Sequence, residues 1–167
     1  VWTEGGLPHL TAQDTHDLFF AQGWLCAADR FFQMDMARRT MRGELSAVLG
    51  DRPAPWKQLT AVFDGASLPD VDHFLRQLSM VPVAAATLEG LASGTRAILD
   101  AYAAGVNAWL ASSPRPLECA LLGYEPEPWR PVDSIVTWKG LAFQLSWGWR
   151  AGLLAEAIRH RFRDDPA

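Results

Sequence analysis

The chain has 167 residues, of which 49% are apolar and 20% charged, values typical of one ordinary globular domain. Its formal net charge is −4, and its arginines are interspersed with acidic residues, which leaves no basic face for nucleic acid. The longest apolar stretches, 117–122 and 135–149, are interrupted by Glu118, Lys139 and Gln144, so no run reaches the roughly 18–20 residues that membrane insertion requires.

Aromatic residues are unusually frequent, with eight Trp and eight Phe. Aromatic side chains bury large areas and are enriched where one protein surface covers another. The composition therefore fits a subunit with a large permanent interface, and it equally fits a Trp-rich core.

The first residues predict extended chain. A turn at 4–6 is followed by Leu7-Pro8-His9-Leu10, and we expect short strands near 1–11. Asp14, with Asp17 three residues later, predicts the start of a helix that ends before Gly43. A second helical turn, 44–49, should stop at Gly50, because glycine takes a left-handed conformation at little cost.

Helical periodicity is weak over 51–82, although a helix over 71–78 is predicted after the start signal Pro69-Asp70. From Thr87 the pattern predicts one helix up to Pro114, with glycines that permit a close neighbour. Its apolar face and its glycines are Leu91, Thr95, Ile98, Tyr102, Val106, Trp109 and Leu110, and Gly90, Gly94 and Gly105.

The stretch 124–131 holds three prolines around Trp129 and predicts extended or turn backbone. Asp133 should cap the next helix, which runs through Leu145. Gly148 and Gly152 favour a bend before a final helix to Arg163. The whole chain therefore reads as a single domain over 1–167, mostly helical, with strands only near its start.

No local motif indicates chemistry in this chain. The four histidines lack metal-ligand spacing, and no nucleophile elbow or phosphate-binding loop occurs. Cys26 and Cys119 are expected to be buried free thiols, with a single bridge as the alternative. Asp29 and Arg30, which lie among aromatic residues, fit either a buried ionic anchor toward another chain or a solvated stripe beside an apolar face.

Several ordered segments carry a resemblance to a known family. They are GLPHL (6–10), AQGWLCAADRFFQMDMARR (21–39), RGEL (42–45), LG (49–50), AYAAGVNAW (101–109), LGY (122–124) and PWRPVD (128–133). In this order they resemble the α chain of the penicillin acylase family. The run from Asp29 to Met34 is more similar to the penicillin-G-type branch than to the lactone and glutaryl cephalosporin branches.

The resemblance implies an N-terminal nucleophile hydrolase made as a zymogen, which cuts itself into an α chain, a spacer and a β chain. In such enzymes the first residue of the β chain, Ser, Thr or Cys, attacks the amide while its own α-amine acts as the base. The implied fold is α+β, in which a mostly helical α chain wraps a four-layer αββα β subunit. No catalytic residue is therefore expected here, because the chain begins with Val1.

The α chain of relatives forms one wall of the acyl pocket, on the helix that follows the WxPxD motif. Counting from Trp129 and Asp133 assigns this wall to Leu141, Ala142, Phe143, Leu145, Ser146 and Trp147, with Trp149 at its edge. A plain core helix would show the same periodicity. Relatives of the penicillin G type carry an Arg–aromatic pair near Leu145 and Ser146, so a preference for phenylacetyl groups does not carry over.

No cofactor is required in such an enzyme, and calcium is an optional structural ion. Relatives bind calcium through β-chain oxygens and one α-chain Glu, and the matching position here is Gly152. The ligand could instead come from Glu156 one turn later, since calcium needs roughly six to eight oxygens.

The resulting expectation is an amidohydrolase that cleaves penicillin-type N-acyl amides, with N-acyl homoserine lactones as the second substrate class. A non-catalytic helical binding module and an inactive homologue are the alternatives. The partner is a β subunit from the same precursor, and neither nucleic acid nor a membrane is involved. Family habit implies a periplasmic or secreted protein. With no signal segment and no initiator Met in view, we expect that any targeting segment was removed or never existed.

Overall fold

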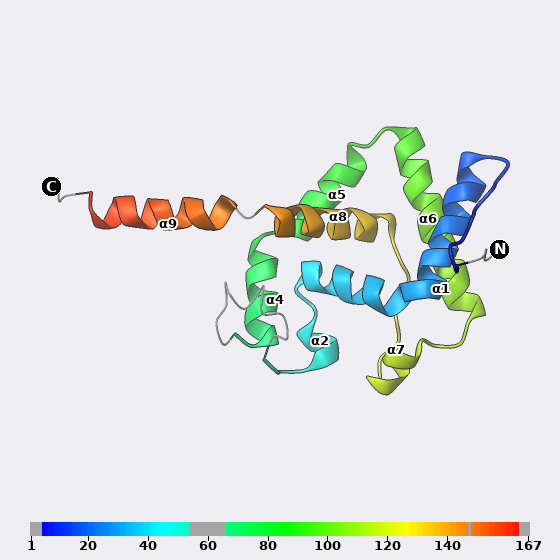
Figure 1. Ribbon diagram of the computed structural model, residues 1–167, viewed down its shortest axis with the longest axis horizontal. Helices are drawn as coiled ribbons and strands as arrows, with labels where there is room; N and C mark the ends of the chain where they lie inside the picture. Colours follow the sequence, from blue (N-terminus) through cyan, green and yellow to red (C-terminus); the bar gives the residue numbers. More distant parts are fainter. Residues whose placement is uncertain (1–4, 54–65, 147, 164–167) are drawn as a thin grey trace.

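The computed structural model describes residues 5–53, 66–146 and 148–163, and these residues form helices joined by turns and loops (Figure 1). The helices are α1 (Thr15–Arg42), α2 (Ser46–Leu49), α4 (Leu68–Gln77), α5 (Met80–Glu89), α6 (Ser93–Ser112), α7 (Leu117–Leu121), α8 (Pro131–Leu145) and α9 (Gly148–Arg161). The prediction of a mostly helical chain is confirmed.

Extended structure is scarce in the described part of the chain. An isolated antiparallel bridge joins Pro53 and Ser67, and residues 5–11 form no strand. Residues 1–4 lie outside the described ones, so the short strands expected near 1–11 stay a prediction. The same holds for the four-layer sheet fold, which the resemblance assigns mainly to a partner chain.

Local capping signals set the two ends of α1. The carboxylate of Asp14 accepts a hydrogen bond from the backbone N–H of Asp17 at 2.8 Å, as the sequence predicts. At the other end Gly43 has φ 66°, and the N–H of Glu44 donates to the carbonyl of Arg39 at 2.9 Å. The predicted stop at Gly50 is also confirmed, with φ 76°.

Helix α1 bends at Arg30, where the backbone leaves helical geometry (φ −153°, ψ 34°). The first half of α1 runs beside α6, and the second half passes beneath α8 (Figure 1). The bend therefore lets one helix take part in two separate packing regions.

Two hydrophobic clusters correspond to these two halves. One gathers on the second half of α1 with α4, α5 and α8, and contains Met41, Leu45, Leu68, Val71, Leu75, Ala84 and Val136. The other joins the middle of α1 to α6 and the proline-rich segment, and contains Ala27, Phe31, Ala103, Val106 and Trp129. Trp129 is 4% exposed, so the proline-rich segment is part of the core.

Two glycines bring α1 and α6 into backbone contact. A Cβ at Gly105 would overlap the backbone carbonyl of Phe20, and a Cβ at Gly23 would overlap that of Tyr102. The sequence predicts such an approach for the glycines of this region, and Gly105 confirms it.

The observed helices differ from the predicted ones in several places. The pattern that starts at Thr87 is broken at Gly90, because α5 ends at Glu89 and α6 begins at Ser93. Helices α5 and α7 were not predicted, and prolines lie at or near their starts. Helix α8 begins at Pro131, with Asp133 in its first turn instead of at its cap. Proline fits the first helical position because its missing N–H has no partner to lose there.

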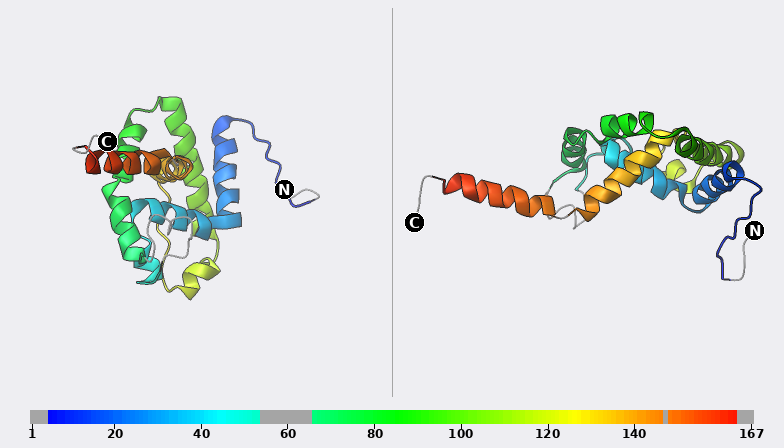
Figure 2. Two further views of the ribbon diagram at one scale, coloured as in Figure 1. Left: turned by 60° about the vertical axis from the view of Figure 1, so that its left-hand side comes forward. Right: turned by 90° about the horizontal axis from the view of Figure 1, so that it is seen from above.

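Helix α9 leads away from the other helices (Figure 2). The apolar residues Leu153, Leu154 and Ile158 of α9, and Phe162 just after it, are 50–63% exposed. This arrangement leaves the side chains of α9 largely open to solvent. Among the described residues, no helix combines the length and hydropathy that crossing a membrane would need.

The glycine contact between α1 and α6 gives a test of the fold. Gly105→Ala should lower the free energy of unfolding by about 1–3 kcal/mol, because the added methyl must push the two helices apart. The matched change Gly94→Ala on the same helix meets no atom within 4 Å, and should raise it by roughly 0.4–1 kcal/mol. Thermal unfolding of both variants checks this, and equal effects would refute the close contact.

Candidate functional site

Helix α8 presents two different faces. Asp133, Val136 and Gly140 are buried against the rest of the chain. Trp138, Leu141 and Leu145 lie on the opposite face and are 80%, 53% and 71% exposed. Spacings of three, four and seven residues place each set on one side of a helix. A continuous apolar stripe of α8 is therefore open to solvent in this chain.

The predicted wall residues fall on both faces. Leu141, Ala142, Leu145 and Ser146 are exposed. Phe143 is half-buried instead and packs against Phe74 of α4, with ring centroids 6.5 Å apart. Trp147 and the side chain of Trp149 lie outside the described residues. The structure thus brings four of the predicted residues onto an open surface and turns one toward α4, and their role in a pocket stays a prediction.

A close approach to α1 fixes the rotation of α8. The side chain of Met41 lies against Gly140, and a Cβ at that position would overlap its sulfur. Val136 is fully buried one turn earlier. With these two residues held inward, Trp138, Leu141 and Leu145 must point outward.

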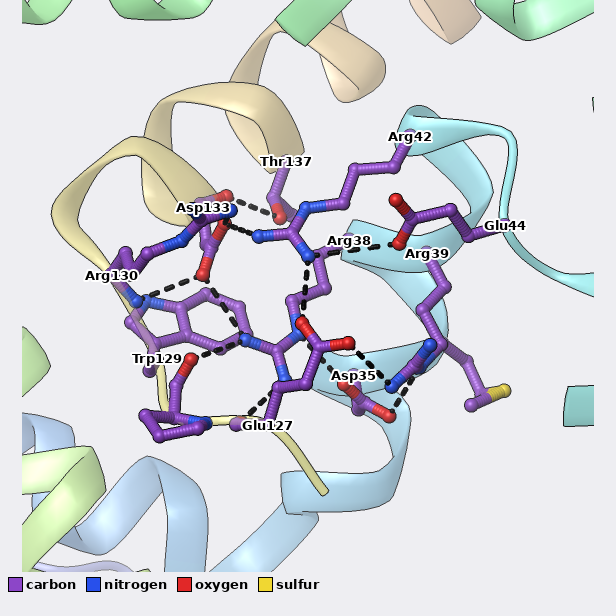
Figure 3. Close-up of polar contacts among 12 residues, drawn as sticks. Asp35, Arg38, Arg39, Arg42, Glu44, Glu127, Trp129, Arg130, Asp133 and Thr137 are labelled. Carbon is purple, nitrogen blue, oxygen red and sulfur yellow. Dashed lines mark hydrogen bonds and ion pairs between the residues drawn. The ribbon is translucent and has the colours of Figure 1, made fainter. Parts of the chain in front are cut away.

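Asp133 ties the start of α8 to α1 (Figure 3). Its carboxylate accepts from Arg38 Nη1 at 3.1 Å, from Arg42, and from the backbone N–H of Arg130 at 2.8 Å. Asp133 and Arg38 are both fully buried. Because a buried charge is tolerated only with a partner, these ion pairs hold the two helices in one relative position.

Asp35 forms the other half of this network. It accepts from Arg38 Nε at 2.7 Å, from Arg39 Nε at 2.9 Å and from the Tyr124 hydroxyl at 2.8 Å. Arg38 thus joins two buried carboxylates, one on its own helix and one on α8 (Figure 3). Every buried side-chain nitrogen and oxygen in the described part of the chain has a hydrogen-bond partner.

The proline-rich segment closes over the same guanidinium. Arg38 donates to the carbonyls of Glu127 at 2.7 Å and Pro128 at 3.0 Å, and its charge lies 5.0 Å from the centre of the Trp129 ring. The side-chain amide of Asn107 pairs with both backbone groups of Trp129. This segment, which lies outside the helices, is therefore tied to α1 by its own carbonyls and to α6 by Asn107.

Two groups of the network, Asp35 and Arg42, are held in their charged forms. Burial alone would raise the pKa of Asp35, but the charge of Arg38 and hydrogen bonds from Arg39 and Tyr124 outweigh it and hold this pKa below its usual value. Burial would likewise lower the pKa of Arg42, and its contacts with Asp133 raise it instead. The neutral form of Asp35 and that of Arg42 are therefore disfavoured, which does not suit either group to proton transfer.

Cys119 is not arranged as a nucleophile. Both cysteines are free thiols, as expected, although Cys26 is only half-buried. Burial raises the pKa of Cys119, whose sulfur donates to the Tyr124 hydroxyl at 3.2 Å. A thiol held in its neutral form reacts slowly, because the thiolate is the reactive species.

Side chains that could share a metal ion lie near the start of α1, away from the predicted ligand Glu156. In the described residues, one set of three suitable side chains is close enough to share an ion, and it consists of the exposed Asp14, His16 and Asp17. Glu156 does not belong to it. The Glu156 side chain is 68% exposed and pairs with Arg159 at 3.2 Å.

The sequence alone did not reveal the ion network. Asp29 and Arg30 form an exposed pair at 3.2 Å in this chain, and an anchor toward another chain stays a prediction. A buried ionic cluster within the chain is made by Asp35 and Arg38, a turn or two later. Charged residues at 35, 38, 39 and 42 recur at helical spacing, and that regularity was the available signal.

Breaking the network should cost far more than breaking a surface pair. We expect Arg38→Met to lower the free energy of unfolding by about 3–5 kcal/mol, since it leaves buried carboxylates without their main counter-charge. Arg30→Met, on the same helix, should change it by less than about 0.5 kcal/mol because its partner is solvated. Urea unfolding monitored by circular dichroism measures both free energies. A small loss for Arg38→Met would contradict the view that the Arg38–Asp133 ion pair acts as a clamp between α1 and α8.

Known proteins are similar to this chain in sequence and in fold. The family model described as penicillin amidase matches residues 1–167. The penicillin acylase 2 proenzyme of Pseudomonas sp. (strain SE83) is 38% identical over 145 residues, which are 86% of this chain and 17% of that protein. Penicillin G acylase of Escherichia coli is 31% identical over 84% of this chain and 16% of its own length.

Other relatives carry a different substrate in their names. An acyl-homoserine lactone acylase of Pseudomonas syringae pv. syringae (strain B728a) is 31% identical over 84% of this chain and 16% of its own length. A solved structure of a thermostable penicillin G acylase from Alcaligenes faecalis superposes with a TM-score of 0.69 at 27% identity. The match covers 100% of this chain and 74% of the solved chain.

This chain spans about a sixth of the length of the curated relatives that it matches. Within that span the agreement extends over most of the sequence and over the arrangement of its helices. The chain therefore belongs to the penicillin amidase family.

Proposed function

We propose that this chain is the α subunit of an amidohydrolase that cleaves the amide bond of N-acyl compounds. The observation that carries the proposal is the apolar stripe of α8, in which Trp138, Leu141 and Leu145 are exposed although α8 is fixed by a buried ion network. Acyl pockets are lined mainly by apolar side chains. A rigid helix that displays such a stripe is suited to form one wall of a pocket completed by a partner.

The nucleophile belongs to the partner β chain in this proposal. An N-terminal Ser, Thr or Cys of that chain attacks the amide carbonyl, and its own α-amine, which titrates near about pH 8, takes the proton. The amide C–N bond then breaks, and the amine leaves with the proton that the α-amine had taken. Water next attacks the acyl-enzyme, which releases the acyl group as a carboxylic acid and restores the nucleophile. This chain contributes binding and orientation of the acyl group.

The lengths of the relatives support a two-chain enzyme. This chain corresponds to 16–17% of the curated relatives, one of which is named a proenzyme, and to 74% of the chain in the solved structure. The matched part is thus a small piece of each full-length relative but most of a separate chain in the crystal. Autoproteolytic processing of one precursor accounts for both values.

Penicillin-type N-acyl amides are the first substrate class in the proposal, and N-acyl homoserine lactones are the second. Relatives named for each class support both of them, and the relative of 38% identity is named for penicillin. The exposed apolar residues of the predicted wall, Leu141, Ala142 and Leu145, are small or aliphatic, while the aromatic Phe143 turns toward α4. They suit an aliphatic acyl chain at least as well as an aromatic one.

Two further parts of the proposal concern the assembled enzyme. Calcium is an optional structural ion whose other ligands come from the β chain, with Glu156 as the candidate ligand here. Glu156 is exposed and would have to leave Arg159 to bind the ion. The enzyme is proposed to be periplasmic or secreted, in keeping with the resemblance of the chain.

A non-catalytic binding module or an inactive homologue would use the same helices without chemistry. A binding module predicts that this chain is stable without a larger partner, whereas an inactive homologue would keep the partner and differ in the partner chain alone. The exposed apolar stripe of α8 argues against the binding module, because isolated proteins rarely leave large contiguous apolar areas uncovered.

Expression of the whole gene tests the subunit assignment. Intact mass and N-terminal sequencing of the purified protein should find this chain together with a larger one that starts with Ser, Thr or Cys. Replacing that first residue by Ala should abolish amide hydrolysis, with Ser↔Cys exchange as the milder control. Recovery of this chain alone, folded and monomeric, would refute the proposal in favour of a binding module.

The pocket wall can be tested at one exposed residue. Leu145→Ala in the assembled enzyme should lower kcat/KM for the preferred acyl chain by about tenfold or more, because the pocket loses apolar contact. Leu121→Ala is the matched control, since Leu121 on α7 is 76% exposed but lies outside the stripe. Identical hydrolysis rates for both variants across a series of acyl lengths would remove Leu145 from the wall.

A further inference from the structure

A groove of about 300 Å³ opens where the two halves of α1 meet α6 and α8. Its α1 residues come from both sides of the bend at Arg30, because the first half of α1 follows α6 while the second half runs under α8 (Figure 1). Residues from all three helices line it, among them Phe19, Met34, Ile98, Tyr102, Thr137 and Trp138.

The lining selects an uncharged occupant. Among the described residues, none that lines the groove carries an acidic or basic side chain. Two of its hydroxyl groups are already engaged, since Ser134 accepts from Trp129 Nε1 at 3.0 Å and Thr137 donates to the Asp133 carbonyl at 2.9 Å. Entry of a charged group would therefore meet desolvation without compensation.

Trp138 connects this groove to the apolar stripe of α8. It lines the groove, is 80% exposed, and lies one turn before Leu141 on the same face. Trp129, in contrast, is 4% exposed and has its ring nitrogen paired. Tryptophan is among the residues most often found at the centre of protein interfaces, where a pocket covers it.

We propose that the groove is the docking site for an apolar segment of the remainder of the same precursor, with Trp138 as the anchor residue of the contact. This inference rests on the proposed function, since it assigns the place where the β chain attaches. The occupant follows from two observations. About five sixths of the length of each relative lies outside this region, and the groove is continuous with the surface that faces the proposed pocket.

A partner segment seated in the groove would also set the distance between the two chains. Trp138 and Leu145 share one rigid helix, and the Arg38–Asp133 clamp fixes that helix. Docking at Trp138 therefore places the rest of the β chain in a defined position relative to Leu141 and Leu145. Docking in the groove would therefore fix the position of the β chain relative to the pocket wall.

Hydroxyl-radical footprinting of the processed two-chain enzyme tests the inference without a mutation. Oxidation of Trp138 should be within about twofold of that of buried Trp129, because an anchor residue is covered by its partner. Leu121 on α7 is the internal reference for an exposed apolar residue. Trp138 oxidised several-fold faster than Trp129, in an enzyme whose two chains are intact, would overturn the proposal.

A charge placed in the groove gives a second test. Ile98→Glu in the full precursor should lower the urea concentration at which the two processed chains separate, and weaken their association about tenfold or more, because the partner's apolar segment would bury an unpaired carboxylate. Thr95→Glu is the matched control, on the same helix but exposed and outside the lining. Equal separation for Ile98→Glu, Thr95→Glu and the unchanged enzyme would contradict the docking site.

The outcomes separate this inference from the function that it builds on. An active two-chain enzyme with a freely oxidised Trp138 leaves the proposed function standing and removes the docking site. A protected Trp138 in an assembly that contains only copies of this chain overturns the assigned occupant. A lone chain with an oxidised Trp138 refutes both, and intact mass identifies that case.

Discussion

The arrangement of this chain depends on one buried guanidinium. Arg38 neutralises Asp35 on its own helix and Asp133 on α8, and it also donates hydrogen bonds to two carbonyls of the proline-rich segment. Buried ion pairs need not add net stability, but removing one partner is expensive, so they penalise every other arrangement strongly. The guanidinium therefore selects one position of α8 relative to α1.

Fixing α8 also fixes what it displays. Once Asp133, Val136 and Gly140 face inward, the opposite stripe with Trp138, Leu141 and Leu145 has to face outward. Charged side chains are thus buried between α1 and α8, while apolar side chains lie on the exposed face of α8. An isolated domain usually shows the opposite distribution, with apolar residues buried and charged residues exposed. The distribution here fits a subunit whose exposed surface becomes the interior of a larger protein.

The parts of the fold that were predictable from sequence have local causes. The starts and stops at Asp14, Gly43 and Gly50 follow from caps that involve neighbouring residues. The break at Gly90 was missed, because residues of α5 and α6 continue one apolar periodicity across it. The Arg38–Asp133 pair joins residues 95 positions apart, and the inward turn of Phe143 depends on Phe74, so neither could be read from local spacing. Motif resemblance predicted that α8 carries a pocket wall, and that role stays a prediction, whereas packing shows which face of α8 is open to solvent.

Hydrogen exchange tests the central claim, that the clamp holds α8 in place, most directly. Arg38→Lys keeps the positive charge and loses the fork that reaches both carboxylates. In the assembled protein, amides of α8 (Pro131–Leu145) should then exchange faster than in the unchanged protein, while those of α6 (Ser93–Ser112) keep their protection. Unchanged protection of α8 in a folded Arg38→Lys protein would show that the apolar contacts alone position the helix, and would contradict the account.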